Sequence, residues 1–348
     1  MYIADMHCDT IMKIWLARRE GKELALRDSS KGCEEMQIDV AKLLKGGYLM
    51  QNFAMYVDYQ MEDGTDPWTQ YQGMVDTYKT EMKANADVIR EAFSYEDIIE
   101  NRDAGLISAV MTVEEGGVLQ GDLDRLKILH DDGARMMTLT WNYENELAYP
   151  NDLPEGMDED YTKYFRFVPR TDNGLKAKGF EAVEIMQELG ILVDVSHLSD
   201  AGFYDVAKTC KGPFVASHSN ARVISGCNRN MTDDMIRTVG EHGGVIGVNF
   251  CPEFLEEGPS EAECKNTIDG IARHARHMIN VGGLETVGLG TDYDGLGECY
   301  LEIADASQMQ KLVSGLEAHG FTANEIESIC YRNVLNLYKE VMPRRTNA

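Results

Sequence analysis

The stretch Leu106-Ile107-Ser108-Ala109-Val110-Met111-Thr112-Val113, followed at once by Glu114-Glu115-Gly116-Gly117, is typical of a buried strand that ends on residues able to do chemistry. Short apolar runs separated by helical patterns predict repeated β-α units with a parallel sheet. Seven further runs follow the same plan, at residues 2–4, 48–57, 136–140, 191–195, 213–216, 245–248 and 287–289. Eight such units predict an α/β fold of the (β/α)8 TIM barrel type.

Composition narrows the class of protein. The 348 residues contain no low-complexity linker, which predicts a single catalytic domain over residues 1–348. A net charge of -26 repels phosphate backbones and acidic lipid, and no apolar run is long enough to span a bilayer. We therefore expect neither nucleic acid nor a membrane as partner. The start of the chain lacks the pattern of a secretion signal, which predicts a cytoplasmic protein.

The segments between the runs show apolar residues at helical spacing, which predicts crossover helices over residues 122–130, 179–189, 201–209, 233–241 and 268–281. Thr322 and Glu325 form a capping-box pattern at the start of a long helix over 322–342, which we expect to cover the barrel. Two segments exceed ordinary connections. Residues 61–95 are largely helical in pattern, and residues 143–172 are either a surface insertion or a lid.

Six residues that can bind metals or move protons fall at the carboxyl ends of the predicted strands, where barrel enzymes have their active sites. They are His7, Asp9, Glu115, His197, His218 and Asp292. His7 and Asp9 are two residues apart on one strand, so their side chains face the same side. Imidazole and carboxylate ligands without thiolate suit Zn2+, with Mn2+, Fe2+ or Co2+ as substitutes.

One carboxylate in such a set can bridge two cations. We assign this role to Glu115, which directly precedes Gly116-Gly117. His7, Asp9 and Glu115 then hold one Zn2+, and Glu115, His197 and His218 hold the other. Two cations that share a water lower its pKa and polarise a carbonyl group, which is the chemistry of a metal-dependent hydrolase.

Neighbouring acids are rivals for these assignments. Strand alternation turns only one of two adjacent residues inward, so Glu114 is the rival of Glu115. Asp294 is the rival of Asp292, and Asp5 is the rival at the first strand. Asp194 and Asp200 flank His197, and each is either a hydrogen-bond partner of a ligand or a helix N-cap.

With these residues placed, the chain resembles the membrane dipeptidase (renal dipeptidase, peptidase M19) family, within the metal-dependent amidohydrolase-like barrels. The resemblance runs from Asp5 to about Tyr338. Its most specific motifs are Asp5-Met6-His7-Cys8-Asp9, Val113-Glu114-Glu115-Gly116-Gly117, Leu192-Val193-Asp194-Val195-Ser196-His197, Ala216-Ser217-His218-Ser219-Asn220 and Gly288-Leu289-Gly290-Thr291-Asp292-Tyr293-Asp294-Gly295.

The resemblance implies the same ligands for two Zn2+ ions, and it implies that Asp292 is the acid/base group. It also implies that Arg229 holds the terminal carboxylate of the substrate, a role that suits the planar guanidinium fork. Trp141 departs from the pattern, since animal members have there a histidine that contacts substrate near the scissile carbonyl. Asn142 is the neighbour that can take over this contact. Cys251 stands where many relatives have a tyrosine.

Together these inferences predict a dinuclear zinc dipeptidase, and the resemblance implies tolerance of a C-terminal D-residue and a homodimer. One alternative is another amidohydrolase on the same site, acting on cyclic amides, lactams or N-acyl amino acids. The other alternative is a barrel that binds a ligand without catalysis.

Overall fold

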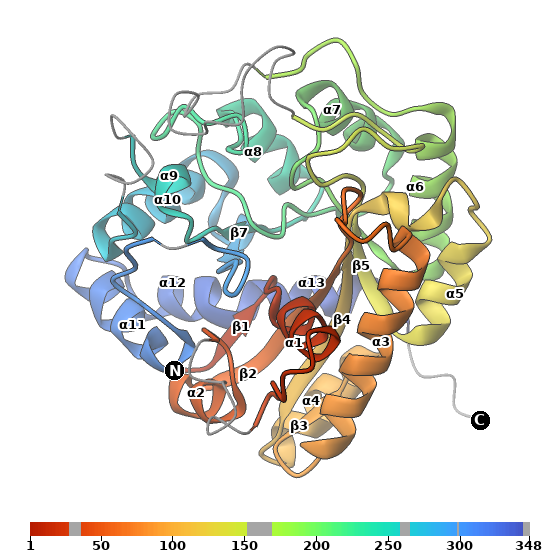
Figure 1. The fold of residues 1–348 in the computed structure, drawn as a ribbon. Helices are drawn as coiled ribbons and strands as arrows, with labels where there is room; N and C mark the ends of the chain where they lie inside the picture. The colour runs from red at the N-terminus through yellow and green to blue at the C-terminus, as the bar shows by residue number, and fades with distance from the viewer. Residues whose placement is uncertain (28–35, 152–168, 258–264, 298, 344–348) are drawn as a thin grey trace.

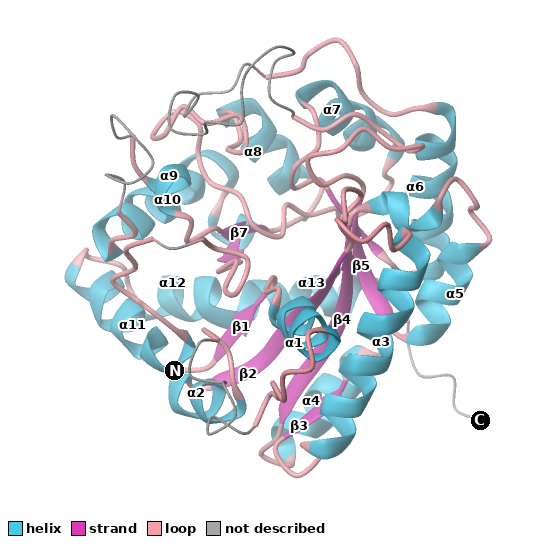
Figure 2. Ribbon diagram, viewed as in Figure 1, coloured by secondary structure: helices cyan, strands magenta, loops and turns pink. Residues whose placement is uncertain are grey.

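Eight parallel strands form one sheet at the centre of the fold, and helices surround it (Figures 1 and 2). The computed structural model describes residues 1–27, 36–151, 169–257, 265–297 and 299–343. Paired strands follow the order β6-β5-β4-β2-β1-β8-β7, with β3 paired to β4. The strands are β1 (Ile3–Asp5), β2 (Tyr48–Tyr56), β3 (Ile89–Glu91), β4 (Ile107–Glu114), β5 (Ala134–Thr138), β6 (Leu192–Asp194), β7 (Ile246–Val248) and β8 (Val287–Leu289).

A very short segment closes the sheet into a barrel between β6 and β7. Val215 bridges Asp194 of β6, and Ala216 bridges Ile246 of β7, both in parallel. The backbone N–H of Val215 donates to the carbonyl oxygen of Val193 at 2.9 Å, and that of Gly247 donates to Ala216 at 2.8 Å. The predicted eight-stranded barrel is confirmed, with its sixth strand reduced to these two residues.

β3 is a strand that the sequence did not predict. It lies within residues 61–95, where a largely helical segment was expected, and it follows the long helix α3 (Pro67–Ala84). It pairs with the first residues of β4, Ile107 to Ala109. Three residues are too few to show a period of two, so the pattern of the preceding helix hides this strand.

The predicted crossover helices lie in the layer outside the strands (Figure 2). The helices are α1 (Thr10–Arg19), α2 (Val40–Gly46), α3 (Pro67–Ala84), α4 (Tyr95–Asp103), α5 (Arg125–Asp132), α6 (Ala177–Leu189), α7 (Asp200–Thr209), α8 (Asp233–Glu241), α9 (Pro252–Leu255), α10 (Ile268–Gly282), α11 (Met309–Ala318), α12 (Ala323–Glu327) and α13 (Asn333–Val341). Short 3-10 turns occupy Gly116–Leu119, Leu284–Thr286 and Ala306–Gln308. None of the described helices is both long and apolar enough to cross a bilayer.

The C-terminal helical segment closes the amino end of the barrel. Its predicted capping box is present, with reciprocal hydrogen bonds between Thr322 and Glu325. A π-helical turn over Ser328–Arg332 joins α12 to α13. Side chains of α13 pack against the inward face of the strands, in a cluster that includes Ala4, Met6, Met50, Val110, Met136, Leu192, Val215, Leu335 and Tyr338. With this end closed, the opposite end of the barrel, where the strands finish, is left for a site.

Residues 143–172 are the segment that was expected to be either a surface insertion or a lid. Residues 152–168 lie outside the described residues. The described part joins the barrel at Asn151, whose backbone N–H donates to the carbonyl oxygen of His197 at 2.9 Å.

Closure of the barrel depends on glycine at position 247. A Cβ added there would lie 2.0 Å from the carbonyl oxygen of Ser217 and 2.9 Å from the backbone nitrogen of Gly290. Backbone atoms cannot swing aside, so Gly247→Ala should lower the free energy of unfolding by about 1–3 kcal/mol or more through overpacking. Urea titration of Gly247→Ala beside Gly212→Ala, whose Cβ meets nothing within 4 Å, measures the difference. Equal free energies of unfolding for the two variants would show that the backbone around Gly247 has room for a side chain.

Candidate active site

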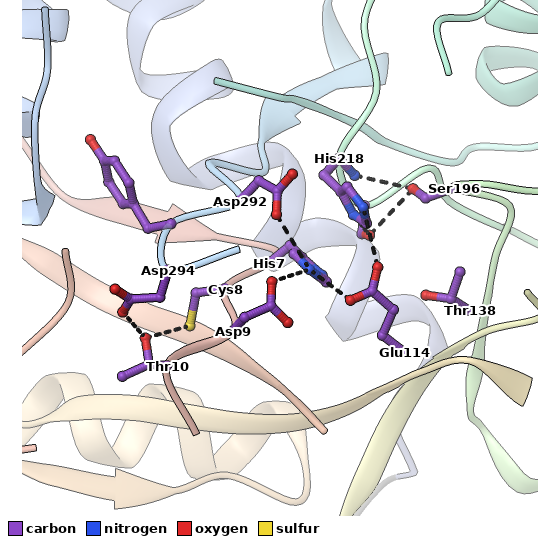
Figure 3. A network of polar contacts seen from close by, with 12 residues as sticks. His7, Cys8, Asp9, Thr10, Glu114, Thr138, Ser196, His218, Asp292 and Asp294 are labelled. Atoms are coloured by element: carbon purple, nitrogen blue, oxygen red, sulfur yellow. Dashed lines mark hydrogen bonds and ion pairs between the residues drawn. The ribbon is translucent and has the colours of Figure 1, made fainter. Parts of the chain in front are cut away.

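Five of the six predicted site residues meet at the carboxyl ends of the strands. Figure 3 shows His7, Asp9, His218 and Asp292 of this group, and His197 lies beside them. His7, which follows β1, lies near the centre of the group. Its Nε2 atom lies 3.4 Å from Asp9 Oδ2 and 3.9 Å from Asp292 Oδ1. The ring of His218 stacks on His7 with centroids 3.9 Å apart. His197 Nε2 lies 3.0 Å from His218 Nε2.

The sixth member of the cluster is Glu114, the last residue of β4. One carboxylate oxygen, Oε2, lies 3.4 Å from His7 Nε2. The other oxygen, Oε1, lies 3.2 Å from His197 Nε2 and 3.5 Å from His218 Nε2. Figure 3 shows this carboxylate between His7 and His218. Its two oxygens therefore face different histidines, as a bridging carboxylate must.

The structure places Glu115 outside this cluster, so the preference for it over Glu114 is corrected. Glu115 Oε2 accepts a hydrogen bond from the Trp141 N–H at 2.6 Å, and Oε1 accepts from the Gly117 N–H at 2.6 Å and from Asn145 Nδ2. Alternation along β4 explains the difference. Val110 packs inside the barrel while Met111 and Val113 pack against the helices, so Glu114 shares the inward face with Val110.

Burial raises the pKa of two acids of this cluster, Glu114 and Asp292. It raises the pKa of Glu114 to about 7, opposed by the charge on His7 and supported by the neighbouring Asp9 carboxylate. Burial likewise raises the pKa of Asp292 to about 6. Like charges held close together in a dry site disfavour ionisation unless a cation balances them.

The three histidines differ in the direction in which their pKa is shifted. Burial lowers the pKa of His197 and of His218 well below the usual value, and the nearby Arg229 and His7 add to the decrease. Burial would lower the pKa of His7 as well, but Glu114 and Asp9 outweigh it and raise the pKa well above the usual value. Neutral imidazole is the form that binds metals, and His197 and His218 are already in it.

Hydrogen bonds on the far ring nitrogens orient His197 and His218. Asn142 Oδ1 lies 2.9 Å from His197 Nδ1. Ser217 Oγ lies 2.7 Å from His218 Nδ1, and the same hydroxyl donates to Asp194 Oδ2. Such partners fix the ring so that Nε2 faces the cluster. Asn142, predicted as a substrate contact, is thus placed against a histidine of the cluster.

Strained backbone brings the polar residues together where the strands end. Glu115, His197, Asp292 and Asp294 are non-glycine residues with positive φ, at 93°, 68°, 62° and 69°. Such conformations are costly and concentrate at functional sites. The approach is also close at Gly295, where a Cβ would lie 2.2 Å from Asp9 Oδ2 and 2.6 Å from Asp292 Oδ1.

Arg229 lies beside the cluster, and its side chain is buried and incompletely paired. Its Nη2 donates to the carbonyl oxygen of His218 at 3.3 Å, while Nε has no hydrogen-bond partner among the described residues. Arg222, seven residues earlier, differs because Asp200 binds it through two hydrogen bonds of 2.7 and 2.8 Å. A buried guanidinium with a free donor is prepared to receive an anion.

Asn249 is a site residue that the sequence analysis gave no role. It directly follows β7, and its Nδ2 donates to Asp292 Oδ2 at 3.0 Å. The same amide group lies 3.4 Å from the His218 carbonyl oxygen. Its position after a predicted strand was a signal that could have identified it.

Trp141 forms part of an aromatic wall on the His197 side of the site. We use this name for Tyr56, Trp141 and Tyr143. The Trp141 ring lies 5.2 Å from Tyr56, 5.1 Å from Tyr143 and 5.9 Å from His197, measured between centroids. The wall is partly exposed, so it can meet a ligand above the histidines.

The rival acids point elsewhere. Asp294 accepts from Thr10 Oγ1 at 2.6 Å and from the Gln37 N–H at 2.7 Å. Asp5 accepts from Thr291 Oγ1 at 2.6 Å, which links β1 to the end of β8. Asp200 binds Arg222, and the N-cap of α7 is Ser199. Asp194 is the one that reaches a histidine, through Ser217.

The donor set fits divalent cations. Two groups of three, His7-Glu114-His218 and His7-Asp9-Asp292, each have ligand atoms within 4.8 Å of one another. His7 Nε2 and Asp9 Oδ1 are buried without a hydrogen-bond partner among the described residues. Nitrogen and oxygen donors without thiolate suit Zn2+ and the neighbouring first-row metals.

The chain is similar to known proteins over nearly its whole length. The family model of membrane dipeptidase, peptidase family M19, matches residues 1–347. The chain belongs to this family. It is a metallo-dipeptidase, a hydrolase of the peptide bond, as its motifs predicted.

Individual relatives are similar over most of their length. An uncharacterized dipeptidase of Schizosaccharomyces pombe is 29% identical over 97% of this chain and 80% of its own. An uncharacterized protein of Klebsiella pneumoniae, from the region 5' of pqqA, is 30% identical over 74% of this chain and 90% of its own.

A solved structure has the same fold. It is a metallo peptidase from Rhodobacter sphaeroides, liganded with a phosphinate mimic of the dipeptide L-Ala-D-Ala. It is 24% identical, covers 98% of this chain and 99% of its own, and superposes with a TM-score of 0.85.

Proposed function

We propose that this dipeptidase works with two Zn2+ ions and that Glu114 is the carboxylate shared between them. The observation that supports this most is the position of Glu114, whose two oxygens face His7 on one side and His197 with His218 on the other. His7, Asp9 and Glu114 would hold one ion, and Glu114, His197 and His218 the other. Two cations would also balance the buried carboxylates of Asp9, Glu114 and Asp292.

The bound ions would supply Lewis acidity toward the scissile carbonyl and would make a water acidic enough to act as nucleophile near neutral pH. The residues of the chain do the rest. Asp292 accepts the proton of the attacking water and returns it to the leaving amine. Asn249 holds Asp292 in place through the hydrogen bond on Oδ2, which leaves Oδ1 facing His7.

The substrate would be held at both ends. Arg229 binds the terminal carboxylate of a dipeptide, since its guanidinium is buried and close to the histidines. Unlike Arg222, which pairs with Asp200, it has no carboxylate partner among the described residues. Trp141 and the rest of the aromatic wall contact the substrate on the His197 side. Asn142 supports that side through His197.

Dipeptides with a C-terminal D-residue are among the proposed substrates. The support comes from the Rhodobacter sphaeroides relative, which has the same fold and was solved with a mimic of L-Ala-D-Ala. A screen of L-L and L-D dipeptides against the zinc-loaded enzyme tests the proposal, with N-acyl amino acids and lactams alongside. Faster turnover of the last two classes would make the chain an amidohydrolase of different specificity.

The two adjacent glutamates should differ sharply in their effect on metal content. Glu114→Gln removes a charge that faces three histidines, so it should lower the Zn2+ content from two ions per chain to one or none. Glu115→Gln, whose carboxylate binds the N–H groups of Trp141 and Gly117, should keep both ions. Elemental analysis after reconstitution and desalting measures this. Loss of metal in Glu115→Gln but not in Glu114→Gln would show that Glu115 is the bridging carboxylate.

Arg229→Ala should lower kcat/KM for free dipeptides by about 10- to 150-fold, the loss of a charge-assisted hydrogen bond worth roughly 1.5–3 kcal/mol. Dipeptide amides lack the carboxylate, so the same variant should cleave them nearly as well as wild type. Arg229→Lys keeps the positive charge but not the planar guanidinium, so its kcat/KM for free dipeptides should lie between the values of Arg229→Ala and wild type. An equal loss for acids and amides would mean that the arginine only supports the fold.

Asp292→Asn should lower kcat by about 100- to 10,000-fold with both metals retained, because the amide cannot accept and return a proton. The effect should be on kcat more than on KM, since proton transfer belongs to the transition state. Asp294→Asn is the matched control, as its carboxylate binds Thr10 and Gln37 instead. Turnover of Asp292→Asn within a few-fold of wild type would exclude the role, and loss of a metal would make Asp292 a ligand.

A further inference from the structure

A chain of three buried groups leads from the wall of the barrel to the far nitrogen of His218. Asp194, the last residue of β6, accepts four hydrogen bonds. Its Oδ1 accepts from the N–H groups of Ser196 and Ser217 at 3.0 and 2.9 Å. Its Oδ2 accepts from Thr138 Oγ1 at 3.0 Å and from Ser217 Oγ.

The direction of these bonds follows from what each group can do. A carboxylate only accepts, so the single hydroxyl proton of Ser217 is directed to Asp194. Ser217 Oγ then has only lone pairs to offer to His218 Nδ1, 2.7 Å away. That contact is a hydrogen bond only if Nδ1 has the proton and donates it. A neutral imidazole has one proton, so Nε2 is left bare.

We propose that Asp194 sets the tautomer of His218 through the hydroxyl of Ser217, which makes Asp194 a positioning residue for the metal site. The bare Nε2 atom then faces Glu114 Oε1 at 3.5 Å and His197 Nε2 at 3.0 Å. Asn142 Oδ1, in the loop after β5, accepts a hydrogen bond from His197 Nδ1 and so leaves His197 Nε2 bare as well. Acceptors that converge without a proton between them repel one another, and a cation removes this repulsion.

The inference rests on the proposed function in one respect, that His218 is a metal ligand. The tautomer of His218 does not depend on the proposed function, because it is a property of the metal-free protein. Asp194→Asn is the sharpest change. The amide oxygen can still serve the two N–H groups, while the NH2 group replaces Oδ2 and donates to Ser217 Oγ. Ser217 then directs its own proton at His218 Nδ1, and the imidazole proton moves to Nε2.

Nitrogen-15 NMR of histidine-labelled, metal-free protein reads the tautomer directly. Wild type should have His218 protonated at Nδ1, and Asp194→Asn should have it protonated at Nε2. Thr138→Val is the matched control, because it removes the other hydroxyl on Oδ2 but leaves the path to His218 intact. It should keep the wild-type tautomer. An unchanged tautomer in Asp194→Asn would overturn the inference.

Zn2+ affinity, measured by competition with a chelator, gives the second reading. Asp194→Asn should bind Zn2+ about 10- to 100-fold more weakly, the usual effect of losing a group that orients a ligand. In a Ser217→Ala background the same change should add little, because the path is already cut. An equal loss in both backgrounds would show that Asp194 acts on the fold and not through Ser217. Failure of wild type to bind Zn2+ would overturn the proposed function and leave the tautomer result standing.

Discussion

The site depends on one constraint, that several like charges are buried together at the open end of the barrel. Asp9, Glu114 and Asp292 all lie near His7, and each is largely removed from solvent. Isolated buried carboxylates are costly, so positive charge nearby stabilises them. His7 supplies part of this charge, and in the proposed function the Zn2+ ions would supply the rest. The positive φ angles at the strand ends and the lack of a side chain at Gly295 serve this constraint. They allow acids from three strands to approach this closely.

Much of the fold could be predicted because its signal is local. Each apolar run ends on a polar residue, and the glycine at position 190 ends α6 in a left-handed conformation, as helix ends often do. The capping box at Thr322 marked the start of the segment that closes the barrel. The sixth strand was predicted over residues 213–216, although only Val215 and Ala216 pair with their neighbours. The three-residue β3 was missed, because it is too short to show a period of two and follows directly on a helical pattern.

The residue types of the site could be predicted more easily than the choice between neighbours. β4 is buried on both faces, so hydrophobicity alone does not show which face is inward. A weaker signal was present, since Ser108, Thr112 and Glu114 share one parity and are the polar residues of that strand. Polar side chains on the inward face of a barrel point to a site. The Gly116-Gly117 pair drew attention to Glu115 instead, whose φ of 93° belongs to the turn.

The sequence could not reveal which side chain acts through which other. Ser217 is next to His218 in the chain, but its partner Asp194 belongs to a different strand, and Asn142 reaches His197 from the loop after β5. The two histidines are therefore oriented by unlike means. His218 is oriented by Ser217 and Asp194, which are buried among the strands of the barrel, so a substitution there would also disturb the fold. His197 depends on a loop that also bears Trp141, so a change in that loop alters the surface offered to substrate and the orientation of a metal ligand together.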